Sequence, residues 1–169
     1  MATVNLRIFR KVILKNRRRM RSFLTRLEKR VPRGMARLQA EADKASWGRT
    51  DCLDCANCCK TMSPTYTVED IRRISEYLNM TPAAFREKWL YKDNTGDWMN
   101  VKQPCQFLDL KTNKCDIYAV RPRDCAGFPH HHKKMGADYM HMYKQNLEYC
   151  PATYRLVEHI MEKASTGQL

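Results

Sequence analysis

The sequence predicts a small α+β fold that is mainly α, with several short helices and a small β-hairpin around a cysteine cluster and a long basic helix before them. Apolar residues recur at helical spacing over most of the chain, stretches of strand character are short, and eight cysteines fall into two groups. A chain of 169 residues suits one domain of roughly 100–150 residues plus an extension. We expect a helical arm over 1–46 and a cysteine-cluster domain over 47–169.

The arm carries most of the positive charge. It holds 14 of the 31 Lys and Arg residues but only 3 of the 18 Asp and Glu residues, which gives it +11 of the formal net charge of +13. Its apolar residues lie three, four or seven positions apart, the spacing of one helical face. This stripe consists of Ile13, Met20, Leu24, Leu27, Val31, Met35 and Leu38. The pattern predicts a long amphipathic basic helix, interrupted near Pro32 and Gly34.

Three roles stay open for this arm. It can pack its apolar stripe on the domain, or it can bind RNA, an anionic membrane or a protein partner, since clustered Lys and Arg release counterions from a polyanion. The third role is targeting, because no acidic residue precedes Glu28.

The remaining elements follow from capping and spacing. Thr67 and Asp70 resemble a capping box before a helix, and Thr81-Pro82 resembles the start of the next one. The predicted helices cover 68–78, 82–91 and 137–149, with a last helix starting at Pro151. The predicted strands cover 98–101, 106–110 and 114–118, with a hairpin loop at 111–113.

The cysteine spacing indicates metal ligands. No apolar run approaches the roughly 18 residues of a membrane span, and we expect neither a transmembrane helix nor a secretory signal. In a cytoplasmic chain, clustered cysteines are metal ligands or reactive thiols more often than disulfides or inert core residues. Metal sites that staple a small domain also stabilise its fold. The sequence therefore predicts a cytoplasmic, metal-stapled domain.

The first group reads C-x2-C-x2-C-C, from Cys52 to Cys59. If the segment is helical, Cys52, Cys55 and Cys59 share a face, and if it is a loop, Cys58 replaces Cys59 in that trio. Eight thiols suffice for two four-thiolate centres of zinc or iron–sulfur. The triple spacing matches a bacterial ferredoxin run and no glycine lies beside the cysteines, which slightly favours iron–sulfur, in one or two centres.

Five elements together resemble a known family. They are the C-x2-C-x2-C-C run, Pro104-Cys105-Gln106-Phe107-Leu108, Cys115-Asp116-Ile117-Tyr118, Arg121-Pro122-Arg123-Asp124-Cys125 and a final Cys150. In this order they resemble the YkgJ-type cysteine-cluster (CxxCxxCC) family of zinc- or iron-chelating proteins, over about 51–151. The resemblance implies metal chelation by Cys52, Cys55, Cys58, Cys59, Cys105, Cys115, Cys125 and Cys150. Ala126 departs from the basic residue that family members commonly have there.

Neighbouring residues add further candidates. His130, His131 and His132 can ligate zinc or iron, although a solvated loop is the favoured interpretation, and His141 and His159 are expected to be surface or core residues. Arg121 and Arg123 either offset the charge of a thiolate centre or pair with Asp116 and Asp124 in a turn.

Three functions remain in competition. The leading hypothesis is a cytoplasmic metal-binding protein whose basic arm docks an unknown protein partner. The first alternative is an RNA- or ribosome-associated binding module with purely structural metal, which uses 1–46 to bind the polyanion. The second is protein lysine methylation, because the family includes a flagellin lysine methylase. No G-x-G-x-x-G loop supports that second alternative, and the sequence leaves catalysis undecided.

Overall fold

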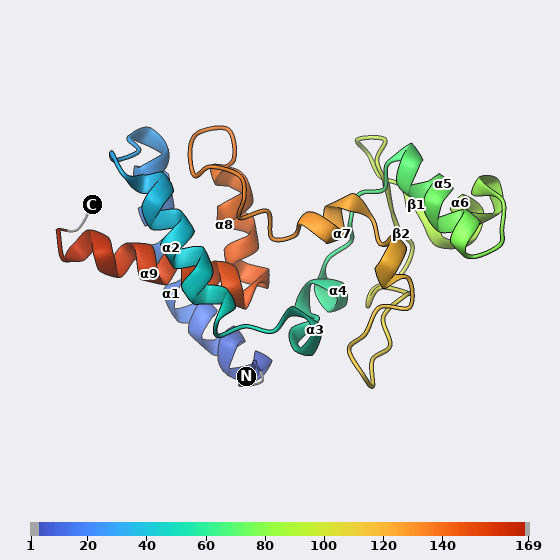
Figure 1. Ribbon diagram of the computed structural model, residues 1–169, viewed down its shortest axis with the longest axis horizontal. Coiled ribbons are helices and arrows are strands. Elements are labelled where there is room, and N and C mark those ends of the chain that lie inside the picture. The colour runs from blue at the N-terminus through green and yellow to red at the C-terminus, as the bar shows by residue number, and fades with distance from the viewer. Residues whose placement is uncertain (1–3, 168–169) are drawn as a thin grey trace. The chain divides into compact units, whose positions relative to one another are not determined.

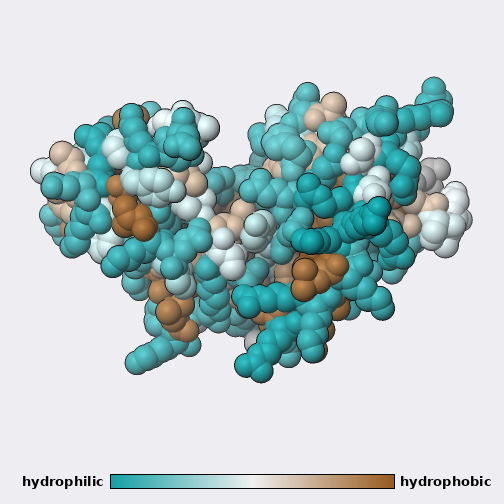
Figure 2. Space-filling model, turned by 180° about the vertical axis from the view of Figure 1, so that it is seen from behind, coloured by the Kyte–Doolittle hydropathy of each residue, from teal (hydrophilic) through white to brown (hydrophobic). Residues whose placement is uncertain are grey.

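The computed structural model describes residues 4–167 and confirms the predicted class, a mainly helical chain with a long N-terminal helix and a small two-stranded sheet (Figure 1). Its contacts divide the chain into two compact units. Unit 1 comprises Met1–Cys55 and Pro129–Leu169, and unit 2 comprises Ala56–Phe128. Within 4–167 no helix has the length and apolar character needed to cross a membrane. On the face drawn in Figure 2, hydrophobic residues appear in small, separate groups.

Unit 1 is built from helices at both ends of the chain. These are α1 (Leu6–Lys29), α2 (Met35–Trp47), α3 (Cys52–Cys55), α8 (Met140–Tyr149) and α9 (Pro151–Ser165). Helix α2 packs along α9, and α1 packs against α8 and α9. Their apolar faces form one core, which includes Met20, Leu24, Tyr143, Leu156 and Ile160. The N-terminal helices therefore pack against the C-terminal helices.

The residues of the predicted stripe that lie on α1 and α2 are buried in this core, whereas Val31, between the two helices, is 43% exposed. The two helices are separated where we expected an interruption, and Gly34 caps α2 with a φ of 87°, a left-handed conformation that glycine adopts without steric cost. The packing role of the stripe is thus confirmed. The predicted division into a basic arm over 1–46 and a metal-binding domain over 47–169 is not tested by this packing. It stays a prediction.

The C-terminal helices follow the sequence closely. The predicted helix over 137–149 begins at Met140 and ends at Tyr149, and the last helix begins at Pro151 as expected. Proline suits this first position because its missing N–H has no partner there in any case. Leu156, Val157 and Ile160 are fully buried.

Unit 2 combines short helices with the sheet. Its elements are α4 (Asn57–Thr61), α5 (Val68–Tyr77), α6 (Pro82–Trp89), β1 (Leu90–Lys92), β2 (Trp98–Asn100), the 3-10 helix η1 (Tyr118–Val120) and α7 (Arg123–Gly127). A second core holds Tyr66, Ile71, Ile74, Phe85, Leu90, Phe107 and Ile117. The capping box before α5 is present, with Thr67 and Asp70 as its two partners.

The sheet differs from the prediction in its partners. The strand predicted over 98–101 is present as β2, but it pairs antiparallel with β1, whose residues the sequence had assigned partly to the preceding helix. The turn between them is closed by Asp93, whose Oδ1 accepts hydrogen bonds from the backbone N–H groups of Thr95 and Asp97. This pairing ends α6 at Trp89.

The predicted strands over 106–110 and 114–118 are wrong. The described residues pair there through a single bridge, between Leu108 and Cys115. The Asp109 carboxylate accepts hydrogen bonds from the Lys111 N–H and the Thr112 hydroxyl, which curls the chain into a turn instead of extending it. Asn113 completes this turn with a φ of 59°. The chain does fold back at 111–113 as expected, since the Asp109 N–H donates to the Lys114 carbonyl oxygen and the Asp116 N–H to the Phe107 carbonyl oxygen, but the two flanking segments are not regular strands.

Candidate metal centre

The C-x2-C-x2-C-C segment is neither a continuous helix nor a loop. It forms two short helical turns, α3 and α4, which are separated by Ala56 in the left-handed conformation with a φ of 44°. The break places Cys52 and Cys55 in unit 1 and Cys58 and Cys59 in unit 2. A side chain with a Cβ adopts this conformation at a cost, so the break is a specific feature of the segment.

None of the eight cysteines, all within the described range 4–167, forms a disulfide. Cys55 and Cys150 are buried, Cys52 is exposed, and the other five are half-buried. Unit 1 contains Cys52, Cys55 and Cys150. Unit 2 contains Cys58, Cys59, Cys105, Cys115 and Cys125.

The backbone joins the cysteines of unit 2 across the sequence. The Cys105 N–H donates to the Cys59 carbonyl oxygen at 2.8 Å, and Cys115 is paired with Leu108, three residues after Cys105. The Sγ atoms of Cys58 and Cys59 lie 3.9 Å apart. These contacts bring the end of the first cysteine group next to the second group.

Electrostatic effects identify four neighbouring thiols. Burial raises the pKa of Cys125, and Cys59, Cys105 and Cys115 raise it further, together with Asp124. Burial also raises the pKa of Cys115 to about 11, against a hydrogen bond from the Ile117 N–H, and Cys105 and Cys59 add to the rise. Cys59, Cys105, Cys115 and Cys125 therefore lie close enough to act on one another.

Cys59 differs from its neighbours. A hydrogen bond from Cys58 lowers the pKa of the Cys59 thiol to about 7, against the opposing effect of burial, and Lys60 contributes to the lowering. A thiolate is the form that ligates metals, so this is the thiol most ready to do so near neutral pH.

Asn100 places a buried donor beside Cys105. Its Oδ1 accepts hydrogen bonds from the Tyr66 hydroxyl at 2.6 Å and from Gln106 Nε2 at 2.9 Å, which fixes the orientation of the amide. Its Nδ2 is buried and makes no hydrogen bond within the described chain, yet it lies near enough to the Cys105 sulfur to lower the pKa of that thiol. The Phe107 N–H acts on Cys105 in the same way, while burial has the larger, opposite effect.

These donors fit a thiolate metal centre. An orphaned N–H in a protein interior is rare and points to a further partner such as a water or a ligating sulfur, and hydrogen bonds to ligating sulfur are usual around metal centres. Four thiolates are a common ligand set for zinc and for iron–sulfur clusters. Among residues 4–167, however, no three His, Cys, Asp or Glu side chains already converge on one point as ligands of an ion. Metal binding here requires the thiols to turn toward a common point.

Cys150 and Cys55 lie near each other in unit 1. Cys150 is the N-cap residue of α9 and makes no side-chain capping hydrogen bond, although the backbone N–H groups of Thr153 and Ala152 lie near enough to its sulfur to lower the pKa of the thiol. Burial nevertheless raises the pKa of the Cys150 thiol, and the nearby Cys55 thiol raises it further. The support expected from the helix N-terminus is present, but burial outweighs it.

The histidines and arginines singled out in the sequence lie in different surroundings. His131 is buried, which corrects the expectation of a solvated loop for all three members of the run, while His132 is exposed. His159 lies 3.3 Å from Glu41, and the exposed His141 lies on α8 as expected. Arg121 stacks on the Tyr118 ring and donates to the Tyr118 carbonyl oxygen.

Sequence reasoning did not find Asn100 or the surroundings of His131. Asn100 resembles any polar residue at a strand end until the fold brings it beside Cys105. The sequence offered no signal for His131, which is the middle one of three consecutive histidines and is followed closely by two lysines.

Comparisons with known proteins cover the same region. The CxxCxxCC family model, described as "putative zinc- or iron-chelating domain", matches residues 51–151 and so includes all eight cysteines. An uncharacterised protein of Methanocaldococcus jannaschii is 36% identical over 76 residues, which cover 44% of this chain and 41% of that protein. The chain thus matches about two fifths of the length of this relative. No solved structure is significantly similar to the chain.

Proposed function

Because this chain belongs to the CxxCxxCC family of zinc- or iron-chelating domains, we propose that it holds zinc or iron through cysteine thiolates. The proposed ligands are those predicted from the sequence, namely Cys52, Cys55, Cys58, Cys59, Cys105, Cys115, Cys125 and Cys150. Thiolates that bind metal need reducing conditions, and a cytoplasmic location is part of the proposal.

Within this set, Cys59, Cys105, Cys115 and Cys125 form one proposed four-thiolate centre. What supports the grouping is the mutual effect of these thiols on their pKa values. Tyr66 gives a further indication, since burial raises the pKa of its hydroxyl and Cys105, Cys125 and Cys115 each raise it further. The bound metal supplies charge that offsets the thiolates, while the chain supplies N–H donors from Asn100, Phe107 and Ile117.

The metal itself stays a proposal between zinc and iron, with an iron–sulfur cluster slightly favoured by the cysteine spacing. The deciding experiment is anaerobic purification, followed by measurement of iron, acid-labile sulfide and zinc per chain. About four irons and four sulfides per centre indicate a cluster, whereas about one colourless zinc per centre indicates a structural site.

The variant Cys125→Ser tests the grouping. We expect it to lose the metal of the proposed centre, because serine replaces a thiolate ligand in a half-buried position. Ala126→Ser is the matched control, since Ala126 is exposed and this change introduces a serine at the adjacent position without removing a thiol. Full metal content in Cys125→Ser would remove Cys125 from the centre.

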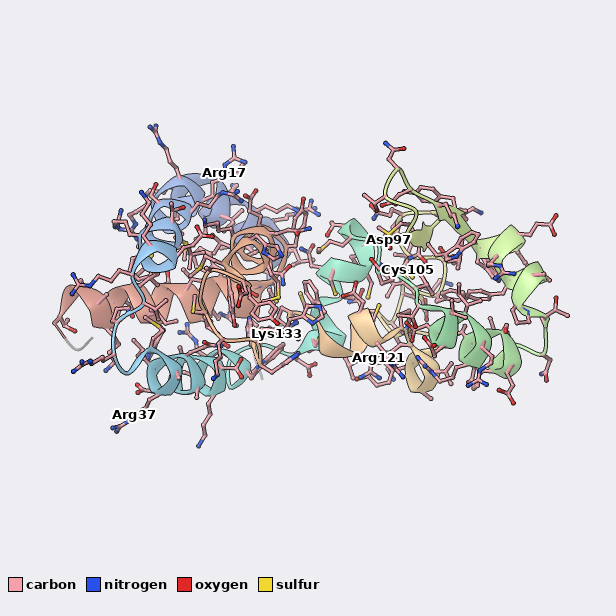
Figure 3. The ribbon with its side chains drawn as sticks, turned by 90° about the horizontal axis from the view of Figure 1, so that it is seen from above. Arg17, Arg37, Asp97, Cys105, Arg121 and Lys133 are labelled. Atoms are coloured by element: carbon pink, nitrogen blue, oxygen red, sulfur yellow. The ribbon has the colours of Figure 1, made fainter. Side chains whose placement is uncertain are left out.

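A second candidate function is supported by the outer surface of α1. Ten Lys and Arg side chains of this helix are exposed, and Glu28 is its one acidic residue. The ten are Arg7, Arg10, Lys11, Lys15, Arg17, Arg18, Arg19, Arg21, Arg26 and Lys29. Of these, Arg17 and Arg21 pair with Glu148. Figure 3 shows Arg17 of α1 and Arg37 of the neighbouring helix α2 extending away from their helices. This surface suits RNA or a similar polyanion.

Deleting 1–46 would not test this candidate, since it would remove α1 and α2 from the core of unit 1. Replacing Arg7, Lys11, Lys15 and Arg18 by Gln keeps the core and removes charge. If the surface binds single-stranded RNA, the slope of log K against log salt should shrink by about 0.7 for each lost phosphate contact. The control replaces the exposed Lys92, Lys102, Lys111 and Lys114 of unit 2 by Gln.

An unchanged affinity and slope in the α1 variant would reject RNA binding by this surface. Docking of a protein partner through the arm is a separate proposal. The same charge variant tests it, because a partner that is pulled down and identified with the wild-type chain should be lost with the variant. The methylation alternative has its own test, which is binding of S-adenosylmethionine to the purified chain.

A further inference from the structure

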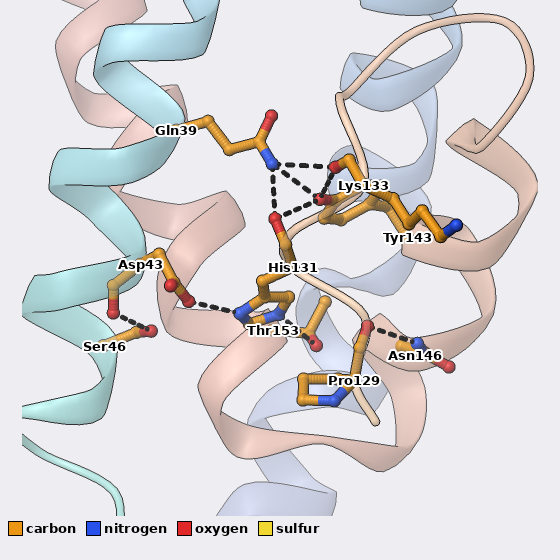
Figure 4. Close-up of polar contacts among 9 residues, drawn as sticks. All are labelled: Gln39, Asp43, Ser46, Pro129, His131, Lys133, Tyr143, Asn146 and Thr153. Carbon is orange, nitrogen blue, oxygen red and sulfur yellow. Dashed lines mark hydrogen bonds and ion pairs between the residues drawn. The ribbon is translucent and has the colours of Figure 1, made fainter. Parts of the chain in front are cut away.

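A polar cluster around His131 in unit 1 is closed to ligands from solvent. The His131 Nδ1 lies 2.6 Å from Asp43 Oδ1 on α2, and its Nε2 lies 2.9 Å from Thr153 Oγ1 on α9 (Figure 4). The side chain of His131 is 3% exposed and Thr153 is fully buried. This cluster therefore holds the loop before α8 to its neighbouring helices and leaves no group for a ligand.

The outer side of α1, by contrast, forms an open groove with α8. Its volume is about 700 Å³, within the range of roughly 300–1,000 Å³ that is usual for small-molecule sites. The charged residues that line it are Arg17, Arg18, Arg21 and Arg26 of α1 and Glu148 of α8. Four arginines against one glutamate leave a surplus of three positive charges. The groove therefore suits a small anion.

Glu148 occupies part of this groove as an internal anion. Its carboxylate lies 2.9 Å from Arg21 Nη1 and 3.7 Å from Arg17 Nη1. Arg18 and Arg26 are exposed, and neither pairs with a carboxylate among residues 4–167. The groove thus contains positive charge that the carboxylates of the described chain do not neutralise.

The donors in the groove suit phosphate. A guanidinium presents a planar fork of N–H groups that matches two oxygens of a phosphate. Ser22 adds an exposed hydroxyl, whereas the Thr25 hydroxyl already donates to the Arg21 carbonyl oxygen. None of the described residues that line the groove is aromatic, and Phe9 and Phe23 of α1 are buried, so a base finds no ring on which to stack. A ligand would be held by its phosphates.

We propose that this groove binds a compact anion with two or more phosphate groups, held by the four arginines after Glu148 is displaced from two of them. One phosphate monoester carries about −1.5 to −2 at pH 7, which is less than the surplus charge of the groove. A free oligophosphate and the phosphate chain of a nucleotide share this chemistry. The inference does not rest on the metal centre, and unlike RNA binding along the whole of α1 it needs neither Arg7 nor Lys11.

The test measures binding of tripolyphosphate and of ATP to the full chain by calorimetry, without added divalent cations. Arg18→Gln with Arg26→Gln removes two charges of the groove, and Gln is a good helix former at these exposed positions. Arg7→Gln with Lys11→Gln is the matched control, because it removes two exposed charges of the same helix outside the groove. Both double variants keep every cysteine, so removal of metal by the phosphates would affect them equally.

A second pair of variants changes the internal anion. Glu148→Gln removes the carboxylate that competes with the ligand for Arg17 and Arg21, and we expect it to strengthen binding about threefold. Glu28→Gln is its control, because Glu28 is also half-buried and ion-paired, with Lys144, but does not line the groove.

The expected result is an affinity about tenfold weaker in the Arg18 and Arg26 variant, little loss in its control, and tighter binding in Glu148→Gln than in Glu28→Gln. Equal affinities for tripolyphosphate and ATP would assign the groove to the phosphate chain alone. Tighter binding of ATP that is still lost with Arg18 and Arg26 would assign it to nucleotides, and both results support the inference. Equal losses in the two double variants, or no binding by the wild-type chain at about 1 mM ligand, would overturn it and leave the proposed metal binding intact.

Discussion

The backbone N–H of Cys105 donates to the carbonyl oxygen of Cys59 at 2.8 Å, so two cysteines far apart in sequence are joined by main-chain atoms. This contact does not depend on the state of either thiol. It therefore keeps the two cysteine groups of unit 2 together while their sulfurs turn toward a metal. A scaffold fixed in this way reduces the conformational entropy that metal binding has to overcome.

Among the thiols of Cys59, Cys105, Cys115 and Cys125, that of Cys59 should react first with an alkylating reagent. Its pKa of about 7 leaves about half of it as thiolate at pH 7, whereas Cys115, with a pKa of about 11, stays protonated. In metal-free protein we expect the alkylation rate of Cys59 to rise with a midpoint near pH 7. Mass spectrometry after iodoacetamide treatment at a series of pH values measures it.

The same shift predicts how stability depends on pH. Because the folded pKa of Cys59 lies below its ordinary value of 9.0, its stabilising effect is present above about pH 9 and is lost as the pH falls through about 7. Cys58→Ala should remove the hydrogen bond that has the largest effect and move the Cys59 midpoint upward. A midpoint that stays near 7 in this variant would show that Cys58 is not the cause.

Asn100→Asp should weaken metal binding about 10–100-fold, because it replaces the buried donor beside Cys105 with a group that carries negative charge. Chelator competition with zinc measures the effect. Asn94→Asp is the control, since it makes the same chemical change at an exposed position of the turn after β1. Equal losses in both variants would point to overall charge instead of the donor.

Removing the metal should destabilise unit 2 more than the helices of unit 1. Unit 2 has a small core, and the binding free energy of thiolate sites is also folding free energy. After chelation we expect faster hydrogen exchange at the amides of Phe107 and Ile117, whose N–H groups face cysteine sulfurs. Exchange at Leu156 and Ile160 in α9 serves as the internal reference. Unchanged exchange at all four would argue against a structural metal in unit 2.

Phe85→Ala should reduce the free energy of unfolding by about 3–5 kcal/mol, the usual range for a fully buried phenylalanine. Phe85 stacks on Phe107 with ring centroids 6.2 Å apart, so the cavity would lie under the Cys105 segment. Urea unfolding of metal-loaded protein measures the change, with Val68→Ala as the control at a residue that is 71% exposed. A loss below about 1 kcal/mol would mean that the core collapses around the cavity.

Local chemistry made several elements predictable. The capping box at Thr67 and Asp70, the Thr81-Pro82 start of α6 and the Pro151 start of α9 each depend on residues within one helical turn, and all three are present. The strands around 111–113 were mispredicted in extent, since the antiparallel pairing beside the Asp109 turn reaches one bridge only and irregular backbone competes with strands beyond it. Such a competition depends on small free-energy differences that residue patterns do not resolve.

The sequence by itself determined the mainly helical class, the basic amphipathic helix and the family of its cysteine motifs. Only the tertiary structure decided which thiols lie together, that Asn100 faces Cys105, and that His131 is buried between Asp43 and Thr153. The physical reason is range. Helix caps and apolar periodicity act between near neighbours in the chain, whereas a ligand set and its hydrogen-bond partners come from segments that meet only when the cores form.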